Sequence, residues 1–232
     1  MSQEKEEDRQ SFFSRLDPTM SRRALSFIKL AYQIAKFNHR WQTRKQTDAK
    51  GEPIRYFEHL RGVALILIDE IGCQIPEMII AALLHDLLED TKNVTEDDLE
   101  IWFGEYGMEV CRLVRLLSKK PKVDYLSRLS IFGDWRVLLL KACDRLHNLR
   151  SLEGTDQKFQ RKIADETLQH YLCLLGHVFT ALPLRYIEAT ARAMFEIERL
   201  AEKHASPDLK RPNGERPPHW RFARLVNKER PS

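Results

Sequence analysis

The sequence lacks the long apolar segments that mark membrane proteins and secreted precursors. Among its 232 residues, no apolar run reaches the roughly 18 residues that a membrane-spanning helix needs. The first ten residues, MSQEKEEDRQ, are charged and contain no apolar core of a secretory signal. We therefore expect a cytoplasmic protein without a membrane partner.

Cysteine is scarce, and its spacing excludes the usual metal motifs. The four cysteines, Cys73, Cys111, Cys143 and Cys173, are far apart and form no C-x-x-C pair. This spacing argues against a zinc site built from thiolates. Because each cysteine has mostly apolar neighbours, we expect four reduced and buried thiols, as is usual inside the cell.

Tandem repeats and alternating strand patterns are also missing. Apolar residues instead recur every three to four positions, which is typical of helices that bury one face. The composition, 43% hydrophobic and 31% charged, is ordinary for a globular protein. The pattern predicts an all-α fold, with residues 43–59 as a loop. Helices are expected over residues 21–37, 59–71, 76–90, 95–103, 107–118, 134–152, 159–179 and 183–203.

This pattern divides the chain into one domain with two tails. Residues 1–20 are predicted to form a flexible lead-in, residues 21–203 the globular domain, and residues 204–232 a basic, proline-rich tail. Trp220 and Phe222 among the basic residues of the tail would suit contact with nucleic acid. A solvated tail, or one docked on a helix, is the commoner case, so nucleic acid is not the expected partner. The net charge of +4 suits an anionic small molecule equally well, and the pattern specifies no oligomeric state.

Acidic residues and a histidine interrupt a leucine-rich segment, LLHDLLEDT, at residues 83–91. In a helix, residues four apart share a face, which pairs His85 with Glu89 and Asp86 with Asp90. Burying carboxylates among leucines is costly unless a cation or a hydrogen-bond partner compensates. One interpretation is a solvated acidic helix end with His85 packed in the core, and the other is a cation site.

Two further segments favour the cation site. The largely apolar segment LLLKACDRLHNLRSL, residues 138–152, contains Asp144 with Asn148 four residues later, and His59 opens the helix expected over 59–71. Two imidazoles and two carboxylates from three helices would form a mixed nitrogen and oxygen site. Such a site suits Mn²⁺, Mg²⁺ or Fe²⁺ with positions left open for water and substrate.

These segments resemble the HD phosphohydrolase superfamily, whose metal ligands follow the order H…HD…D. The sequence is most similar to the hydrolase domain of the RelA/SpoT alarmone enzymes, including the stand-alone small alarmone hydrolases of the Mesh type. The resemblance covers residues 31–176. Its motifs are HRWQTRK (39–45), GEP (51–53), EHLRGVALIL (58–67), AALLHDLLEDT (81–91), FGEYGMEVCRLV (103–114), LLLKACDRLHNLRSL (138–152) and KIADETLQHY (162–171).

The resemblance implies an HD-type helical bundle and a role for each matching residue. His59, His85, Asp86 and Asp144 would hold one Mn²⁺, with Mg²⁺ or Fe²⁺ as less favoured ions. Glu89 and Asp90 would orient and activate the attacking water. Arg44 and Lys45 would lie beside the guanine and phosphates, and Asn148 and Ser151 would contact the nucleotide. Ser151 stands where the family usually has threonine and retains a hydroxyl.

The activity implied is a metal-dependent guanosine-3′,5′-bis(diphosphate) 3′-pyrophosphohydrolase, which converts (p)ppGpp to GDP or GTP plus pyrophosphate. About 55 residues follow Gly176, too few for an additional synthetase domain of roughly 100 residues, so we expect the hydrolase half alone. The alternatives are another HD-type nucleotide phosphohydrolase and a non-catalytic module that binds alarmone.

The sequence departs from the family before the first expected ligand. The segment GEPIRYFEH is about two residues longer than usual between Pro53 and His59, and Leu60 stands where proline is common. Arg55 and Tyr56 in this enlarged loop are expected to alter substrate fit.

Other polar residues near the motifs receive structural assignments. His39 is expected to be a hydrogen-bonding structural residue, and His147 is expected to pack or to bond to the backbone. We interpret Lys141, Arg145 and Arg150 as salt-bridge partners within the helices.

Overall fold

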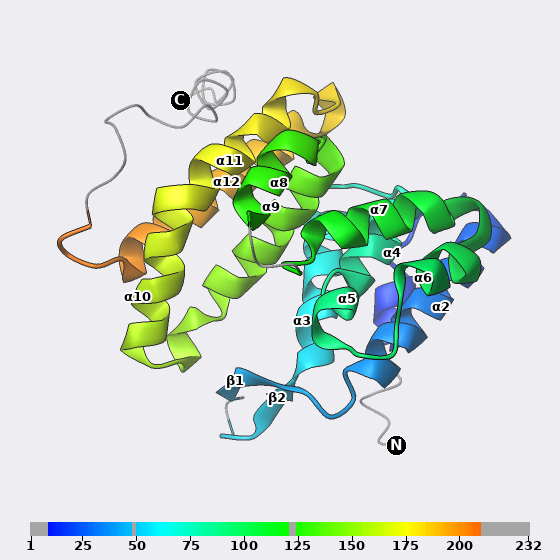
Figure 1. The fold of residues 1–232 in the computed structure, drawn as a ribbon, viewed down its shortest axis with the longest axis horizontal. Coiled ribbons are helices and arrows are strands. Elements are labelled where there is room, and N and C mark those ends of the chain that lie inside the picture. The colour runs from blue at the N-terminus through cyan, green and yellow to red at the C-terminus, as the bar shows by residue number, and fades with distance from the viewer. Residues whose placement is uncertain (1–8, 48–49, 121–123, 210–232) are drawn as a thin grey trace.

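The computed structural model describes residues 9–47, 50–120 and 124–209, and these residues are mainly helical (Figure 1). Residues 9–13 form a short helix. The α-helices that follow are α2 Arg22–Asn38, α3 Tyr56–Leu65, α4 Pro76–Leu84, α5 Leu87–Asp90, α6 Glu96–Phe103, α7 Gly107–Leu117, α8 Tyr125–Phe132, α9 Trp135–Arg150, α10 Gln157–Glu166, α11 Leu172–Gly176 and α12 Leu184–His204. Short 3₁₀ or π turns are η1 Ile66–Glu70, η2 Gly104–Tyr106, η3 Leu152–Gly154, η4 Thr167–Tyr171 and η5 His177–Thr180. The expected all-α class is confirmed.

The helices form two groups that meet mainly at α9, which packs against α3, α4 and α7. Helices α2 to α7 make up one group and α8 to α12 the other, and α3 packs directly against α9 (Figure 1). Helix α4 lies at the centre of the first group, in contact with α2, α3 and α7, and its residues Met78–Leu84 are all buried. A helix that is apolar on every side is stable only when it is enclosed in this way. None of the helices in the described ranges combines the length and apolar composition that crossing a membrane requires.

The helix expected over residues 76–90 is two helices with a break at the acidic–histidine segment. Helix α4 ends at Leu84 and α5 begins at Leu87. Asp86 has φ −98° and ψ 0°, away from the regular helical values of about −63° and −42°. The chain forms a tight turn directly after the break, in which the Asp90 N–H donates to the Asp86 carbonyl at 2.9 Å. The break therefore lies at the pair His85–Asp86.

The loop expected over residues 43–59 instead contains an antiparallel hairpin. Strands β1 (Thr43–Thr47) and β2 (Pro53–Arg55) pair, with Thr43 opposite Arg55 and Thr47 opposite Pro53. The prediction of no strand was wrong here because the inward-facing residues of β1 are polar. Arg44 is half-buried and Gln46 is buried, and both donate hydrogen bonds to the Ser151 hydroxyl.

The helix expected over residues 159–179 is also interrupted, and α8 was not expected at all. Within the interrupted region the buried hydroxyl of Thr167 donates to the Ile163 carbonyl at 2.6 Å. A threonine side chain that bonds back to the preceding turn competes with the backbone bonds of the helix. The π turn η4 begins at this residue.

Three of the four cysteines are buried as expected, and the fourth is not. All four are free thiols, but Cys173 on α11 is exposed. Its neighbours Leu172 and Leu175 are buried, so Cys173 lies on the outer face of that short helix. The apolar neighbours of Cys173 therefore face the core on the other side of α11.

Part of the expected flexible lead-in packs against the domain. Phe12 and Leu16 are 1% and 6% exposed, and the Phe12 ring lies 5.3 Å from the ring of Tyr32 on α2. The expected tail from residue 204 is described as far as residue 209. There, Ser206 N–H donates to Asp165 on α10 at 2.8 Å. The remainder of the tail, with Trp220 and Phe222, lies outside the described residues.

Truncating Phe12 tests whether the lead-in belongs to the domain. We expect Phe12→Ala to lower the free energy of unfolding by about 3–5 kcal/mol, the usual cost of deleting a buried aromatic side chain. The measurement is urea unfolding followed by circular dichroism. Phe13→Ala, at a partly buried position beside it, serves as the control and should cost less. A change below about 0.5 kcal/mol for Phe12→Ala would show that the segment contributes nothing to stability.

Candidate active site

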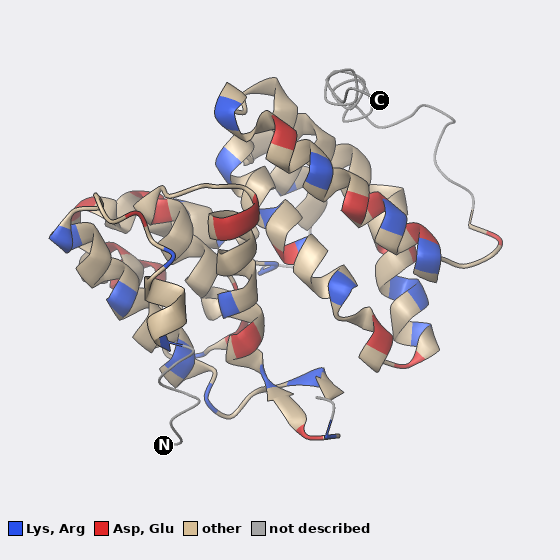
Figure 2. Cartoon of the chain, turned by 180° about the vertical axis from the view of Figure 1, so that it is seen from behind, with Lys and Arg blue, Asp and Glu red and all other residues tan. Residues whose placement is uncertain are grey.

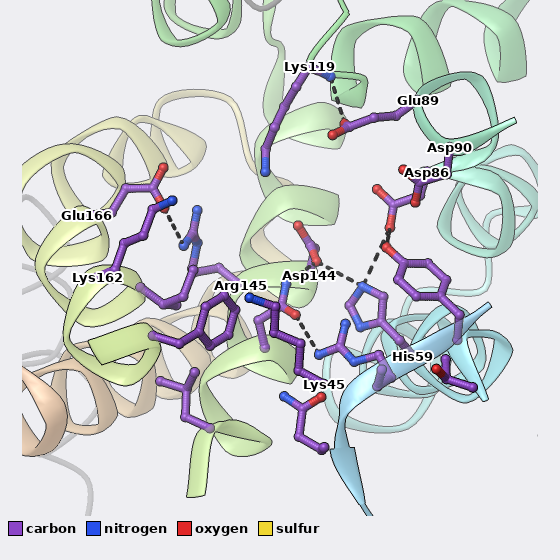
Figure 3. Close-up of a pocket in the computed structure, with 18 of the residues that line it drawn as sticks. Lys45, His59, Asp86, Glu89, Asp90, Lys119, Asp144, Arg145, Lys162 and Glu166 are labelled. Atoms are coloured by element: carbon purple, nitrogen blue, oxygen red, sulfur yellow. Dashed lines mark hydrogen bonds and ion pairs between the residues drawn. The ribbon is translucent and has the colours of Figure 1, made fainter. Parts of the chain in front are cut away.

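The four side chains predicted as metal ligands lie where α3, α9 and the break between α4 and α5 meet, and Figure 3 shows His59, Asp86 and Asp144 of this set. His59 Nε2 lies 3.2 Å from Asp144 Oδ1 and 3.8 Å from Asp86 Oδ2. His85 Nε2 lies 3.1 Å from Asp86 Oδ2 and 3.7 Å from Asp144 Oδ1. Neighbouring ligands around an octahedral ion with bonds near 2.1 Å are about 3 Å apart. The packing of separate helices thus brings donor atoms of His59, His85 and Asp86 within 4.8 Å of one another, and Asp144 Oδ1 lies within 3.7 Å of both imidazoles.

The hydrogen bonds of His85 fit a role as a cation ligand. Its Nδ1 lies 2.8 Å from the Ala82 carbonyl, which can only accept, so Nδ1 carries the proton. Its Nε2 is buried and makes no hydrogen bond among the described residues. That nitrogen faces the Asp86 carboxylate at 3.1 Å, and a cation placed between the two would be bound by both. The donor set of two imidazoles and two carboxylates therefore fits a divalent ion.

The carboxylates of Asp86 and Asp144 give the site a negative potential that favours cations. Burial alone would raise the pKa of Asp144, but Lys141 and the two histidines outweigh burial and hold that pKa well below its usual range. Burial alone would lower the pKa of His85, but the carboxylates of Asp86 and Asp144 outweigh it and raise that pKa to about 9. The carboxylates therefore stabilise the positive charges around them, and Lys141 and the histidines in turn stabilise the ionised carboxylate of Asp144.

Three of the four expected ligands, Asp144, Asp86 and His59, are each held by a further side chain. Asp144 accepts from Lys141 Nζ at 2.8 Å and from Asn148 Nδ2 at 2.7 Å, both on α9. Asp86 Oδ2 accepts from the Tyr56 hydroxyl at 2.6 Å. His59 Nδ1 lies 3.0 Å from His147 Nδ1. His147 was expected to pack or to bond to the backbone, but it contacts the side chain of His59 because α3 crosses α9 at this point.

The ligand cluster lies at one side of a cavity of about 500 Å³. Glu89 and Asp90 line this cavity together with Asp86. Glu89 Oε2 accepts from the backbone N–H of Lys119 at 2.9 Å, which fixes the carboxylate. Burial, with help from the charges of Asp86 and Glu89, raises the pKa of Asp90. Asp86, Glu89 and Asp90 thus line the same cavity because the chain makes a tight turn after Asp86. They do not lie on one continuous helix.

The four residues predicted to contact the nucleotide also lie in or beside this cavity. Arg44 Nη2 donates to Asn148 Oδ1 at 2.9 Å and to Ser151 Oγ at 3.2 Å, and this contact ties the hairpin to the end of α9. Lys45 Nζ lies 4.0 Å from the centre of the Phe159 ring on α10. Their roles toward a nucleotide stay predictions, while their juxtaposition is observed.

The comparisons with known proteins agree with this geometry. A family model described as HD domain matches residues 31–177. The chain belongs to the HD domain family.

Curated relatives extend the comparison. The chain is 34% identical over 218 residues to a protein of Brucella melitensis named GTP pyrophosphokinase rsh, covering 88% of this chain. It is 40% identical over 153 residues, 62% of this chain, to a guanosine-3′,5′-bis(diphosphate) 3′-pyrophosphohydrolase of Aquifex aeolicus. The matches span 25% and 20% of these relatives, so the chain corresponds to a minor part of each.

A solved structure of a metazoan ortholog of SpoT, described as hydrolyzing ppGpp and playing a role in starvation responses, is similar along most of the chain. Its TM-score is 0.54 at 25% identity, and the match covers 81% of this chain and 96% of that one. The resemblance drawn from the sequence motifs is confirmed.

Several residues that line the cavity of this HD domain were not predicted to be site residues. Lys119, Arg145, Phe159, Lys162 and Glu166 line it, and Lys162 and Glu166 lie across the cavity from His59 and Asp86 (Figure 3). Arg145 is buried, pairs with Glu166 at 3.3 Å and stacks on Tyr171 at 3.8 Å. It was interpreted as a salt-bridge partner, which is confirmed, but it also forms part of the cavity wall.

His39 and Arg150 have the structural contacts that were expected of them. His39 is buried, lies 2.6 Å from Gln42 Oε1 through its Nδ1 and stacks on Tyr56. Arg150 pairs with Glu70 and Glu196 on the surface, where basic and acidic residues are interspersed along the helices (Figure 2). The expected effect of the enlarged loop before His59 on substrate fit stays a prediction. There, Arg55 pairs with Glu58 on the first turn of α3, while Tyr56 lines the cavity.

Proposed function

We propose that this HD domain is a metal-dependent hydrolase that removes the 3′-pyrophosphate of ppGpp or pppGpp, with GDP or GTP and pyrophosphate as products. The observation that carries the proposal is the cavity, which is lined by His59, Asp86 and Asp144 at one side and by Glu89 and Asp90 beside them, with His85 3.1 Å from Asp86. Basic side chains, including Arg44, Lys45 and Lys162, line the same cavity, as an anionic substrate requires. The names of the Aquifex relative and of the metazoan structure support this substrate over other nucleotides.

The ion proposed is one Mn²⁺, held by His59, His85, Asp86 and Asp144. Support comes from the equal share of imidazole and carboxylate donors, which suits a borderline ion better than Mg²⁺. Fe²⁺ and Mg²⁺ are the less favoured alternatives. A divalent ion at this site supplies Lewis acidity, which lowers the pKa of water and offsets phosphate charge.

The side chains around the site have separate tasks in this proposal. One carboxylate of the pair Glu89 and Asp90 accepts a proton from the water that attacks the 3′-phosphorus, the bond between that phosphorus and the 3′-oxygen breaks, and the 3′-oxygen leaves as a hydroxyl with a proton from solvent. Arg44 and Lys45 offset the charge that the phosphates carry. Asn148 and Ser151 contact the nucleotide, and their bonds to Arg44 set the position of its guanidinium.

The test is turnover of ppGpp by the purified chain with added Mn²⁺. We expect release of pyrophosphate and GDP, complete loss of turnover after EDTA, and recovery when Mn²⁺ is returned in excess. Cleavage of another nucleotide while ppGpp survives would favour a different HD-type nucleotide phosphohydrolase. Binding of ppGpp without cleavage under all conditions would favour the non-catalytic module.

A further inference from the structure

The second ring nitrogen of His59 has an unusual partner for a metal-binding histidine. Its Nε2 faces Asp144 and Asp86, so Nδ1 points away from the donor cluster and lies 3.0 Å from His147 Nδ1. Metal-binding histidines usually donate this second N–H to a carboxylate, a carbonyl or water, groups that readily accept. An imidazole nitrogen, in contrast, can either donate or accept, so His147 must itself be in the tautomer whose Nδ1 accepts.

The positions of the protons follow from the contact. A cation on His59 Nε2 requires a lone pair there, which places the proton of the neutral ring on Nδ1. That proton can only be directed at His147 Nδ1, so His147 must accept with Nδ1 and carry its own proton on Nε2. His85 needs no such arrangement, because its Nδ1 faces the Ala82 carbonyl.

The packing of α3 on α9 holds His147 in the required place. Gly62 lies three residues after His59 and therefore on the same face of α3. A Cβ atom added at Gly62 would lie 2.1 Å from His147 Nε2, so only glycine leaves space for the ring. The His59 and His147 rings are 4.8 Å apart at 64°, with His147 three residues after Asp144 on α9.

We propose that His147 is a positioning residue for the metal site. Its Nδ1 accepts the proton of His59 Nδ1 and so holds His59 in the tautomer and orientation in which Nε2 binds the divalent cation. Gly62 provides the space for this contact. The inference rests on the proposed metal site and is independent of which nucleotide the site cleaves.

The first experiment measures the affinity of the metal-stripped full chain for Mn²⁺ by calorimetry. His147→Leu removes the acceptor, and we expect it to weaken Mn²⁺ binding roughly 10–100-fold, the usual effect of losing such a partner. His147→Asn retains an acceptor near the position of Nδ1 and should bind within about threefold of the unmodified protein. His170→Leu, at an exposed position on η4, is the control and should bind normally.

Two further measurements separate positioning from a general loss of structure. Gly62→Ala displaces the His147 ring without changing its chemistry and is expected to weaken Mn²⁺ binding as His147→Leu does. Long-range ¹H–¹⁵N spectra of the protein loaded with diamagnetic Zn²⁺ should show a protonated Nδ1 on His59 and an unprotonated Nδ1 on His147.

Normal Mn²⁺ affinity in His147→Leu, or a proton on His147 Nδ1 in these spectra, would overturn the role of His147 alone. If the unmodified protein binds no divalent ion, both this role and the proposed metal site are wrong. If it binds Mn²⁺ but does not cleave ppGpp, the proposed activity fails while the role of His147 stands.

Discussion

Replacing Asp86 by alanine is expected to abolish turnover and to weaken Mn²⁺ binding by at least roughly a hundredfold, more than the loss of an outer partner does. Asp86 Oδ2 is the oxygen that faces both histidines, 3.1 Å from His85 Nε2 and 3.8 Å from His59 Nε2. Without it, the site retains Asp144 as its one remaining carboxylate among the four expected ligands. The half-buried Tyr56 hydroxyl also loses its acceptor at the wall of the cavity.

The measurement is Mn²⁺ titration followed by calorimetry, combined with the ppGpp assay at saturating Mn²⁺. Asp97→Ala is the matched control, because Asp97 is an exposed carboxylate on the first turn of α6 and does not line the cavity. Near-normal Mn²⁺ affinity in Asp86→Ala would show that the cation, if bound, lies elsewhere. A parallel loss in Asp97→Ala would point to nonspecific ion binding by surface acids.

The candidate ligands were predictable because the sequence places acids where helical patterning demands apolar residues. Asp144 occurs within a long apolar helix, and the structure shows it buried with Lys141 and Asn148 on either side. Those two partners lie three residues before and four residues after Asp144, so helical spacing alone brings them together. Contacts within one helix are the part of a site that a single sequence specifies best.

Contacts between helices could not be predicted in this way. Tyr56 and Asp86 are 30 residues apart, and His59 and His147 are 88 residues apart. Both contacts depend on how α3 lies against its neighbours, which hydrophobic spacing within α3 does not specify. The position of Lys162 also depends on contacts between helices, because Lys162 lines the cavity only through the packing of α10.

The hairpin was missed for a different physical reason. Strands are recognised by alternating apolar residues, but β1 has the sequence TRKQT and packs through polar side chains. Arg44 bonds to Asn148 and Ser151, so hydrogen bonds replace the apolar contacts that usually fix the register of a strand. A strand built to present cations to a cavity therefore looks like a loop in its sequence.

Replacing Glu89 by glutamine is expected to separate chemistry from metal binding, lowering kcat about 10²–10⁴-fold while Mn²⁺ affinity stays within a few-fold. The amide retains the shape of the side chain and its acceptor for the Lys119 N–H, but it cannot take a proton from water. Glu188→Gln, an exposed glutamate on α12, should leave both quantities unchanged. Loss of Mn²⁺ binding in Glu89→Gln would place Glu89 among the cation ligands. Unchanged kcat would leave Asp90, whose pKa is raised by burial, as the proton acceptor.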